Sequence, residues 1–266
     1  MRLIATNLLL MQLVIFSHVL FAQDSSRFAA IVIDDLGNDL VLGERLVSLP
    51  HALTYAFLPH TKYAKKLIEL SRMRQQEIML HMPMQAISNK AMGPGGLNVS
   101  MQRQQFVNIV KANIRAIPGA VGVNNHMGSL LTQSKVKMQW LMEELKQNKN
   151  LYFLDSRTHA ASIAAVQAQA YHIPNAKRDI FLDHVVTAKE IERQFQRLLK
   201  KINRVGHALA IGHPHAETVK ALQNWLPKLK AQGIEIVPVS RYISLIKTRS
   251  LMWQASLSRS HKVVKN

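Results

Sequence analysis

The chain has 266 residues and a formal net charge of +18, with 34 Lys and Arg against 16 Asp and Glu. This length is enough to bury a full core in one large domain or in two. The absence of cysteine excludes disulfides, thiolate zinc sites and cysteine nucleophiles. The charge suits an acidic partner, but no nucleic-acid-binding signature accompanies it. We interpret it as a basic surface and expect no nucleic-acid partner.

The N-terminus is typical of a secretory signal. Arg2 precedes the apolar run LIATNLLLMQLVIFSHVLFA, the polar residues QDSSR follow it, and Ala22 is a suitable last residue before cleavage. The alternative is an uncleaved anchor. Polar groups cost free energy inside a bilayer, and the run contains three of them, Asn7, Gln12 and His18. We predict a signal peptide at residues 1–22, export to the periplasm or cell envelope, and no further membrane span.

After residue 26, short apolar runs alternate with helical periodicity. The apolar runs predict strands at residues 29–33, 53–57, 77–80, 120–123, 152–154, 208–211 and 235–238. The amphipathic stretches predict helices at residues 62–74, 100–116 with Ser100 as N-cap, 134–147, 187–202 and 216–232. Strands separated by helices indicate a parallel sheet covered by helices. Six or seven such units favour a barrel or an open wound sheet.

Two segments lack this alternation. The stretch ISNKAMGPGGLNV, residues 87–99, is rich in Gly and Pro and predicts a loop near the site. It is not a phosphate-binding loop, because no Gly-Lys-Ser/Thr follows. After Tyr242 the pattern fades, so we interpret residues 245–266 as a basic, partly disordered tail and residues 27–244 as the folded domain.

Polar side chains follow five of the predicted strands. In parallel α/β folds, sites form at the carboxyl ends of the strands, so these side chains should build one polar pocket. They are Asp34 and Asp35, then His81, then Asn124, Asn125 and His126, then Asp155, Ser156 and Arg157, and finally His213 and His215. The motif KRDIFLDH adds Arg178, Asp179, Asp183 and His184.

These residue types fit metal-assisted hydrolysis of an amide or ester. Asp35, His81 and His126 can ligate a divalent metal and leave positions open for water and substrate. Such a metal polarises a carbonyl and lowers the pKa of bound water. Asp34 can then accept the proton of that water, and His213 can protonate the leaving group.

Other polar residues at the same edge are candidates for supporting roles. Asp155, Asp179 or Asp183 can fix the tautomer of a histidine, and Arg157 or Arg178 can hold a carboxylate. Simpler interpretations stay open, because an Asp-Asp pair before Gly is often a turn or a helix N-cap, and the arginines can pair with neighbouring aspartates. The candidates for supporting or substrate contacts are Asn125, Asp155, Arg157, Arg178, Asp183 and His215.

In this order, the motifs IVIDDLG, LHMPMQ, GVNNHMGS, LDSRT, RDIFLDH and IGHPH resemble the divergent polysaccharide deacetylase family. This family is a distant branch of the carbohydrate esterases that share the NodB-type deacetylase domain. The resemblance covers about residues 27–244. It implies an α/β fold, a deformed (β/α) barrel of about seven parallel strands, and a divalent metal, most often zinc.

The resemblance also assigns residues. Asp34 matches the base, Asp35 and His81 match metal ligands, and Gln85 stands where the deacetylases have a second histidine ligand. The divergent branch carries its histidine at the position of His126. The histidine that acts as the acid matches His213 best, with His215 as a weaker match.

Three hypotheses follow from the sequence. The first is an exported metal-dependent hydrolase that removes acyl groups, such as acetyl, from an envelope glycan. The second, favoured by Gln85, is a catalytically inactive envelope protein that binds glycan or a protein partner. The third, nucleic-acid binding, is weakest, because basic and aromatic residues are not interleaved.

Overall fold

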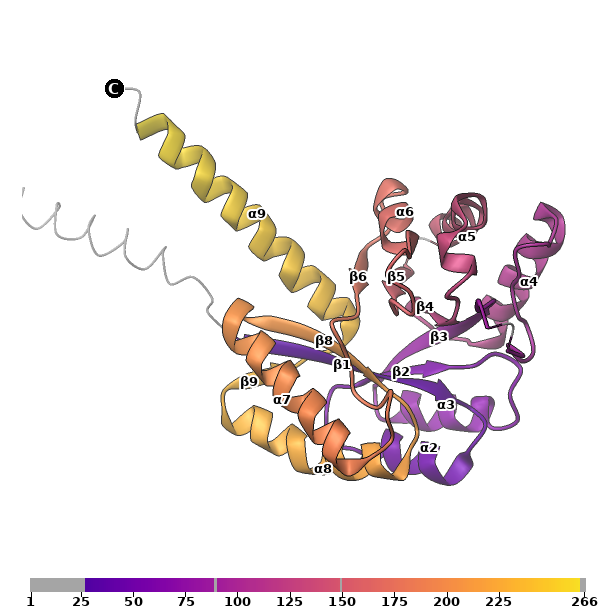
Figure 1. The fold of residues 1–266 in the computed structure, drawn as a ribbon, viewed down its shortest axis with the longest axis horizontal. Helices are drawn as coiled ribbons and strands as arrows, with labels where there is room; N and C mark the ends of the chain where they lie inside the picture. Colours follow the sequence, from indigo (N-terminus) through magenta and orange to yellow (C-terminus); the bar gives the residue numbers. More distant parts are fainter. Residues whose placement is uncertain (1–26, 89, 149, 264–266) are drawn as a thin grey trace, which may run out of the picture.

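The computed structural model describes residues 27–88, 90–148 and 150–263, so the predicted signal peptide lies outside the described residues. Strands and helices alternate along most of the chain (Figure 1). The strands are β1 (Arg27–Leu36), β2 (Thr54–Phe57), β3 (Glu77–Met84), β4 (Gly122–Met127), β5 (Tyr152–Asp155), β6 (Asn175–Lys177), β7 (Ile180–Phe181), β8 (His207–Gly212) and β9 (Ile234–Ile236). The helices are α2 (Leu40–Val47), α3 (Ala64–Met73), α4 (Arg103–Ala116), η1 (Leu131–Gln133), α5 (Lys135–Gln147), α6 (Ala164–Ala170), α7 (Ala188–Val205), α8 (Ala216–Ala231) and α9 (Val239–Val263).

The strands form one parallel sheet in the order β6-β5-β4-β3-β2-β1-β8-β7. Strand β9 pairs with the first residues of β1. The sheet curls into a half-barrel with helices around it (Figure 1), which confirms the predicted deformed (β/α) barrel. Eight strands lie along the path and β9 is a ninth, compared with about seven predicted. The additional strands β6 and β7 are three and two residues long, too short to show an alternating pattern.

Alternation along the central strand separates two cores. Phe28, Ala30 and Val32 of β1 belong to a smaller cluster on the inner face of the curled sheet. The residues between them join the larger cluster, in which the outer face of the sheet packs against the surrounding helices. Because side chains alternate with a period of two, the next inner-face position after Val32 is Asp34. The hydrophobic pattern therefore already directs this carboxylate into the half-barrel.

Helix α9 closes the inner cluster at the amino ends of the strands. Its residues Val239, Tyr242 and Ile243 are buried there. The Tyr242 hydroxyl lies 2.9 Å from Nδ1 of His207 on β8. From this anchor the helix runs away from the domain to Val263 (Figure 1). Residues 245–263, interpreted from the sequence as a tail, are thus helical in the structure. Up to Ala255, as far as the burial of its side chains is described, only the first turns of α9 have a buried face, which is too short a pattern to predict the rest.

Other predicted boundaries shift in ways that matter for the site. Strands β3 and β4 continue to Met84 and Met127, beyond the predicted ends at residues 80 and 123. Helix α4 takes Gln102 at its N-cap position, and the Ser100 hydroxyl donates to Asn98 Oδ1 instead. Among the described residues, no helix combines the length and the apolar character needed to cross a membrane.

Candidate metal centre and active site

The inner face of the sheet becomes polar at the carboxyl ends of its strands. Asp34 ends the inner stripe of β1, His81 continues that of β3, and His213 follows that of β8. Asn124 and His126 lie two residues apart on β4 and therefore share its inner face. The strand register thus brings these polar side chains together at one edge of the sheet, as the sequence predicts.

Asp35 reaches the same pocket because β1 is irregular there. The pairing of β1 with β2 shifts between Ile33 and Leu36, which is a β-bulge. Asp35 has a φ of 59°, in the left-handed region that Asp tolerates better than most residues. Without this distortion, alternation would direct Asp34 and Asp35 to opposite faces. The N-cap of α2 is Asp39, whose side chain accepts from Leu42 N, so neither neighbouring carboxylate is used as a cap.

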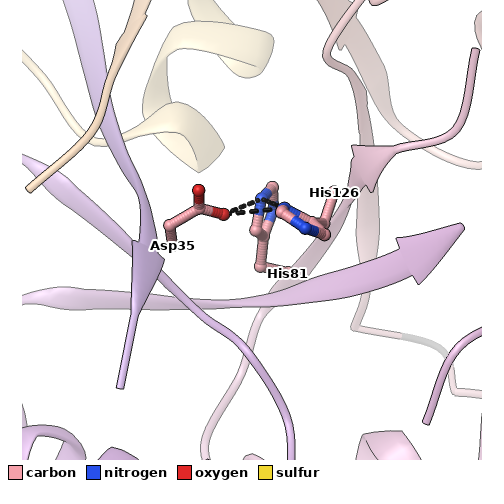
Figure 2. A group of neighbouring side chains, drawn as sticks. All are labelled: Asp35, His81 and His126. Carbon is pink, nitrogen blue, oxygen red and sulfur yellow. Dashed lines mark hydrogen bonds and ion pairs between the residues drawn. The ribbon is translucent and has the colours of Figure 1, made fainter. Parts of the chain in front are cut away.

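Three side chains converge on one point (Figure 2). Asp35 Oδ1 lies 3.0 Å from His81 Nε2 and 2.7 Å from His126 Nδ1, and these two nitrogens are 3.2 Å apart. Despite these short distances, Asp35 Oδ1 is a buried atom without a hydrogen bond of acceptable geometry. Ligand atoms about 2.0–2.1 Å from a tetrahedral ion lie roughly 3.3 Å from one another. The spacing and the donor set, one carboxylate and two imidazoles, therefore fit a divalent metal such as zinc.

Asn124 connects this cluster to Asp34. Its Oδ1 lies 2.7 Å from His81 Nδ1, and its Nδ2 donates to Asp34 Oδ1 at 2.8 Å. An amide oxygen only accepts, so Nδ1 of His81 carries a proton, and Nε2, which faces Asp35 and His126, is the nitrogen that can offer a lone pair to a metal once it is deprotonated. One side chain thus sets the tautomer of His81 and the position of the Asp34 carboxylate.

The adjacent Asn125, which the sequence placed among the supporting residues, points to the other side of the strand. Its Oδ1 accepts from Ser156 N at 2.9 Å, and its Nδ2 donates to the Met127 carbonyl at 2.7 Å. Because β4 runs on to Met127, a period of two separates Asn125 from Asn124 and His126. Asn125 fixes the turn that follows β5.

Asp155 and Arg178 serve the same turn. The Asp155 carboxylate accepts from Arg157 N and from the Ser162 hydroxyl, both at 2.9 Å. Arg178 donates to the carbonyls of Ser156 and Arg157 at 2.6 and 2.8 Å. Within the part of the chain that the structure describes, neither arginine forms an ion pair. The structure therefore does not show the carboxylate contact considered for them from the sequence.

Of the three aspartates considered for a supporting role, Asp155, Asp179 and Asp183, it is Asp183 that contacts a histidine of the site. Its Oδ1 lies 2.8 Å from His213 Nδ1, and its Oδ2 accepts from His213 N at 2.6 Å and from the Thr218 hydroxyl at 2.7 Å. Phe181 stacks on the His213 ring with centroids 5.0 Å apart. Nδ1 of His213 is therefore committed to Asp183, and Nε2 is the nitrogen left for chemistry.

The remaining candidates lie outside this arrangement. Asp179 pairs with Lys201 at 2.6 Å and accepts from Leu209 N at 2.9 Å. His215 occupies the N-cap position of α8 without a capping hydrogen bond, and its ring centroid is 6.3 Å from that of His213. The choice among Asp155, Asp179 and Asp183, left open by the sequence, thus falls on Asp183.

Burial and charge shift the pKa values in opposite directions across the pocket. Burial raises the pKa of Asp34, although the charges of His81 and His213 oppose it. Burial also opposes ionisation of Asp35, but the two imidazoles outweigh it and hold its pKa well below the usual range. Burial lowers the pKa of His213, but Asp183 outweighs it and raises the pKa to about 9. His213 is therefore protonated at neutral pH.

A pocket of about 250 Å³ borders Asp35 and His126. One wall is the segment from Leu58 to Thr61, and the other includes residues 91–94 of the loop rich in Gly and Pro, which confirms that this loop lies near the site. Gln85, at the position of the lost histidine, accepts from Val99 N at 2.9 Å through Oε1. Its side chain thus holds the loop and does not join the cluster.

Three residues of the site were not assigned a role from the sequence: Asn124, Phe181 and Thr218. A signal existed only for Asn124, which shares a strand face with His126 once β4 is extended. Phe181 belongs to a two-residue strand, and Thr218 lies one turn inside α8. Their roles depend on how β7 and α8 pack around Asp183, which no local pattern encodes.

Comparisons with known proteins agree with this fold. An uncharacterized protein of Haemophilus influenzae is 34% identical over 231 residues, covering 87% of this chain and 81% of that protein. The crystal structure of an uncharacterized protein from Agrobacterium tumefaciens has a TM-score of 0.78 at 24% identity, covering 82% of this chain and 89% of that one. The peptidoglycan deacetylase PdaC from Bacillus subtilis has a TM-score of 0.55 at 13% identity, covering 87% and 97% of the two chains.

The family comparison is the most direct. The family model described as "Divergent polysaccharide deacetylase" matches residues 31–243, which include every polar residue placed at the site above. The relationship predicted from the order of the motifs is therefore confirmed. This chain belongs to the divergent polysaccharide deacetylase family.

Proposed function

We propose that the protein is a metal-dependent hydrolase that removes acyl groups, such as acetyl, from an envelope glycan. The observation that carries this proposal is the convergence of Asp35, His81 and His126 beside Asp34 and opposite His213. In support of it, a candidate ligand set lies at one edge of the sheet together with a carboxylate of raised pKa and an imidazole whose pKa is raised to about 9. Pairs of groups with pKa values shifted apart are typical of acid–base catalysis.

Asp35, His81 and His126 would hold the ion, with zinc as the first candidate. A divalent ion bound there supplies polarisation of the acyl carbonyl and a water of lowered pKa. Asn124 keeps His81 in the tautomer that such binding requires. The cluster's own charges favour a proton on His81, whose pKa Asp34 and Asp35 raise against the effect of burial. Metal binding and protonation therefore compete at this imidazole.

The proton transfers are assigned to Asp34 and His213. Asp34 accepts the proton of the attacking water, and its raised pKa makes it a better acceptor than an exposed carboxylate. His213 donates its Nε2 proton to the departing nitrogen or oxygen of the sugar. Asp183 stabilises the imidazolium and holds the ring while Phe181 covers one face.

A glycan substrate in the cell envelope is the finer part of the proposal. It is supported by the family description, by the peptidoglycan deacetylase among the structural neighbours, and by a net charge of +18 that suits an anionic polymer. Residues 1–22 are proposed to act as the export signal. Supporting contacts to substrate from Arg157 and His215 are part of the same proposal.

Metal content tests the proposal first. The chain from Gln23 to Asn266 is purified without chelators, and bound metals are quantified beside the variants Asp35→Asn and His126→Ala. Asn tolerates the left-handed backbone of residue 35, so this variant removes the charge without straining the bulge. We expect near-stoichiometric divalent metal in the wild type and its loss in both variants.

The matched control is His184→Ala, a half-exposed histidine outside the cluster, which should keep its metal. Metal-loaded protein is then assayed for acetate release from acetylated glycan fragments. If the wild-type protein binds no metal even after metal is added back, this result would contradict the hydrolase mechanism.

A catalytically inactive envelope protein that binds glycan or a protein partner is the second candidate. The observation in its favour is Gln85, whose side chain holds a loop where the deacetylases have a ligand. The variant Asp34→Asn separates the two candidates, because it removes the proton acceptor while leaving the surface intact. Full function of this variant in cells would favour the binding protein.

A further inference from the structure

Helix α9 is basic along its length. The helix contains no acidic residue over its 25 positions, whereas five of them are Lys or Arg. Lys247 is exposed on it, and Arg204 is exposed on α7 next to Val205, which lines a groove with residues of α9. A helix whose Lys and Arg residues are not balanced by Asp or Glu suits an anionic partner.

The outer part of α9 exposes large apolar side chains. Leu251, Met252 and Trp253 are 56%, 54% and 63% exposed, and Val205 of α7 is 44% exposed. Trp253 is seven and eleven residues after Ile246 and Tyr242, which places it on the side of the helix that is buried nearer the domain. Met252 and Trp253 join Val205 and Arg249 around a groove of about 640 Å³. Consecutive exposed apolar residues beside cations are uncommon on a surface that faces only water.

We propose that this outer part of α9, with the end of α7, binds the surface of an anionic lipid bilayer. Met252 and Trp253, which share the groove with Val205, would enter the boundary between headgroups and acyl chains, and Leu251, Lys247 and Arg204 would lie around them at the level of the headgroups. Tryptophan favours that boundary because its ring is apolar and its N–H is polar. The proposal does not depend on the hydrolase activity.

Charge separates this partner from the alternatives. A second copy of α9 would bring two acid-free helices together, and their like charges would repel. A nucleic acid would satisfy the cations but not the exposed Leu251, Met252 and Trp253, of which only the tryptophan can stack on bases. An anionic bilayer satisfies both the charge and the apolar side chains.

The position of α9 keeps the candidate active site clear of such a surface. Phe28, the second residue of β1, lies under the Arg249 guanidinium, 4.5 Å from it. The outer part of α9 therefore leaves the domain at the amino ends of the strands, whereas Asp34 and Asp35 lie near the carboxyl end of the same strand (Figure 1). The apolar run of residues 3–22 is joined to this same end of β1. Lipid contact here would leave the pocket open to polymer on the other side.

Vesicle binding tests the proposal. The chain from Gln23 to Asn266 keeps every residue that the structure describes and omits the apolar run, which would bind lipid by itself. It is mixed with vesicles of phosphatidylglycerol and phosphatidylethanolamine, or of phosphatidylcholine, at low salt. Of the three tryptophans in the chain, Trp225 is buried and Trp140 packs on Phe106, so Trp253 is the one placed to report lipid contact. We expect binding to the anionic vesicles and a blue shift of the tryptophan emission.

Two variants test the residues. The triple variant Leu251→Ser, Met252→Ser, Trp253→Ser and the double variant Arg204→Glu, Lys247→Glu should each bind at least tenfold more weakly, with unchanged thermal unfolding. Met73→Ser, at an 82% exposed apolar residue of α3, and Lys65→Glu, at an exposed lysine of the same helix, are the matched controls and should bind like the wild type. No binding of the wild type to anionic vesicles, or equal binding of the triple variant, would overturn the proposal. Binding to DNA in place of vesicles would overturn it as well.

Discussion

At the scale of single residues, the two adjacent carboxylates of β1 show how a local irregularity makes a site. Alternation alone would send only Asp34 into the half-barrel. The bulge and the left-handed φ of 59° bring Asp35 beside it, against two imidazoles. Strained backbone of this kind costs on the order of 1–3 kcal/mol and persists where the surrounding structure enforces it. The cost is consistent with a functional position.

Asn124 should matter for metal binding, although its side chain is not one of the three that would ligate the metal. The variant Asn124→Ala removes the acceptor of His81 Nδ1 and the donor to Asp34. Loss of such an orienting partner typically weakens metal affinity by about 10–100-fold. Competition with a chelator measures the affinity, and Asn125→Ala, which points to the other face of β4, is the matched control. Equal affinities in the two variants would argue against the tautomer role.

The pair Asp183 and His213 predicts a pH dependence of stability. The folded pKa of His213 is about 9, above the unfolded value of 6.5, so its contribution is fully present below pH 6.5 and is lost as the pH rises through 9. The free energy of unfolding of the wild type should therefore decline across this interval. The variant Asp183→Asn should be less stable at pH 6 and should show a flatter decline, measured by urea unfolding at several pH values. A decline of unchanged size in the variant would contradict the assignment.

The same pair predicts a change in the activity profile if the hydrolase proposal holds. An acid of pKa near 9 keeps kcat/KM level until the pH approaches that value. Without the Asp183 charge, His213 should titrate at lower pH, and the alkaline limb of the profile should move down with it. Loss of activity at all pH values without a shift of the limb would indicate a structural role only.

At the scale of elements, how much of the site can be predicted from the sequence depends on where the hydrophobic pattern of each strand ends. The candidate site residues were predicted because hydrophobic runs end at them, as MLH does at His81 and AIGH at His213. The predicted end of β4 at residue 123 was wrong, since the strand continues to Met127 through polar residues. The apolar pattern stops where the site begins, so hydrophobicity could not separate Asn124 from Asn125. The polar residues of the site therefore make the end of β4 impossible to recognise from hydrophobicity.

The loop between β3 and α4 depends on one buried amide of the helix. Asn113 of α4 is fully buried, donates to the Gly95 carbonyl at 2.8 Å and lies 3.1 Å from His60 Nε2. Gly95 has a φ of +74°, and a Cβ there would lie 2.2 Å from Asn113 Oδ1. Asn113 therefore holds both segments that line the pocket beside Asp35.

Replacing this amide should loosen the pocket walls. Asn113→Ala leaves the Gly95 carbonyl without its partner, which costs roughly 1–3 kcal/mol. Faster proteolysis between residues 90 and 100, together with a lower melting temperature, is the expected result. Asn108→Ala, at an exposed asparagine of the same helix, is the control and should change neither. Unchanged proteolysis in Asn113→Ala would show that the loop is held by other contacts, such as Gln85 to Val99.

At the scale of the whole molecule, the parallel sheet was within reach of the sequence, but its strand order and its closure were not. Alternating strands and helices predict the sheet, and the order of the motifs led to the family. The missing information concerns α9, whose first turns fill the inner cluster that a half-barrel would otherwise expose. The pattern fades because the side chains from Lys247 to Ala255 are not buried, although the helix continues.

Truncation should separate these two parts of α9. A chain of residues 23–250 keeps Tyr242, Ile243, Leu245 and Ile246. Its melting temperature should lie within a few degrees of that of residues 23–266. A chain ending at Pro238 loses Val239, Tyr242 and Ile243 from the inner cluster. Losing a buried aromatic residue alone costs about 3–5 kcal/mol, a large share of the typical stability of about 5–15 kcal/mol. We expect this chain to be unfolded or loosely packed by near-ultraviolet circular dichroism and thermal melting. A cooperative transition close to that of the longer chain would show that the half-barrel does not need α9 to close it.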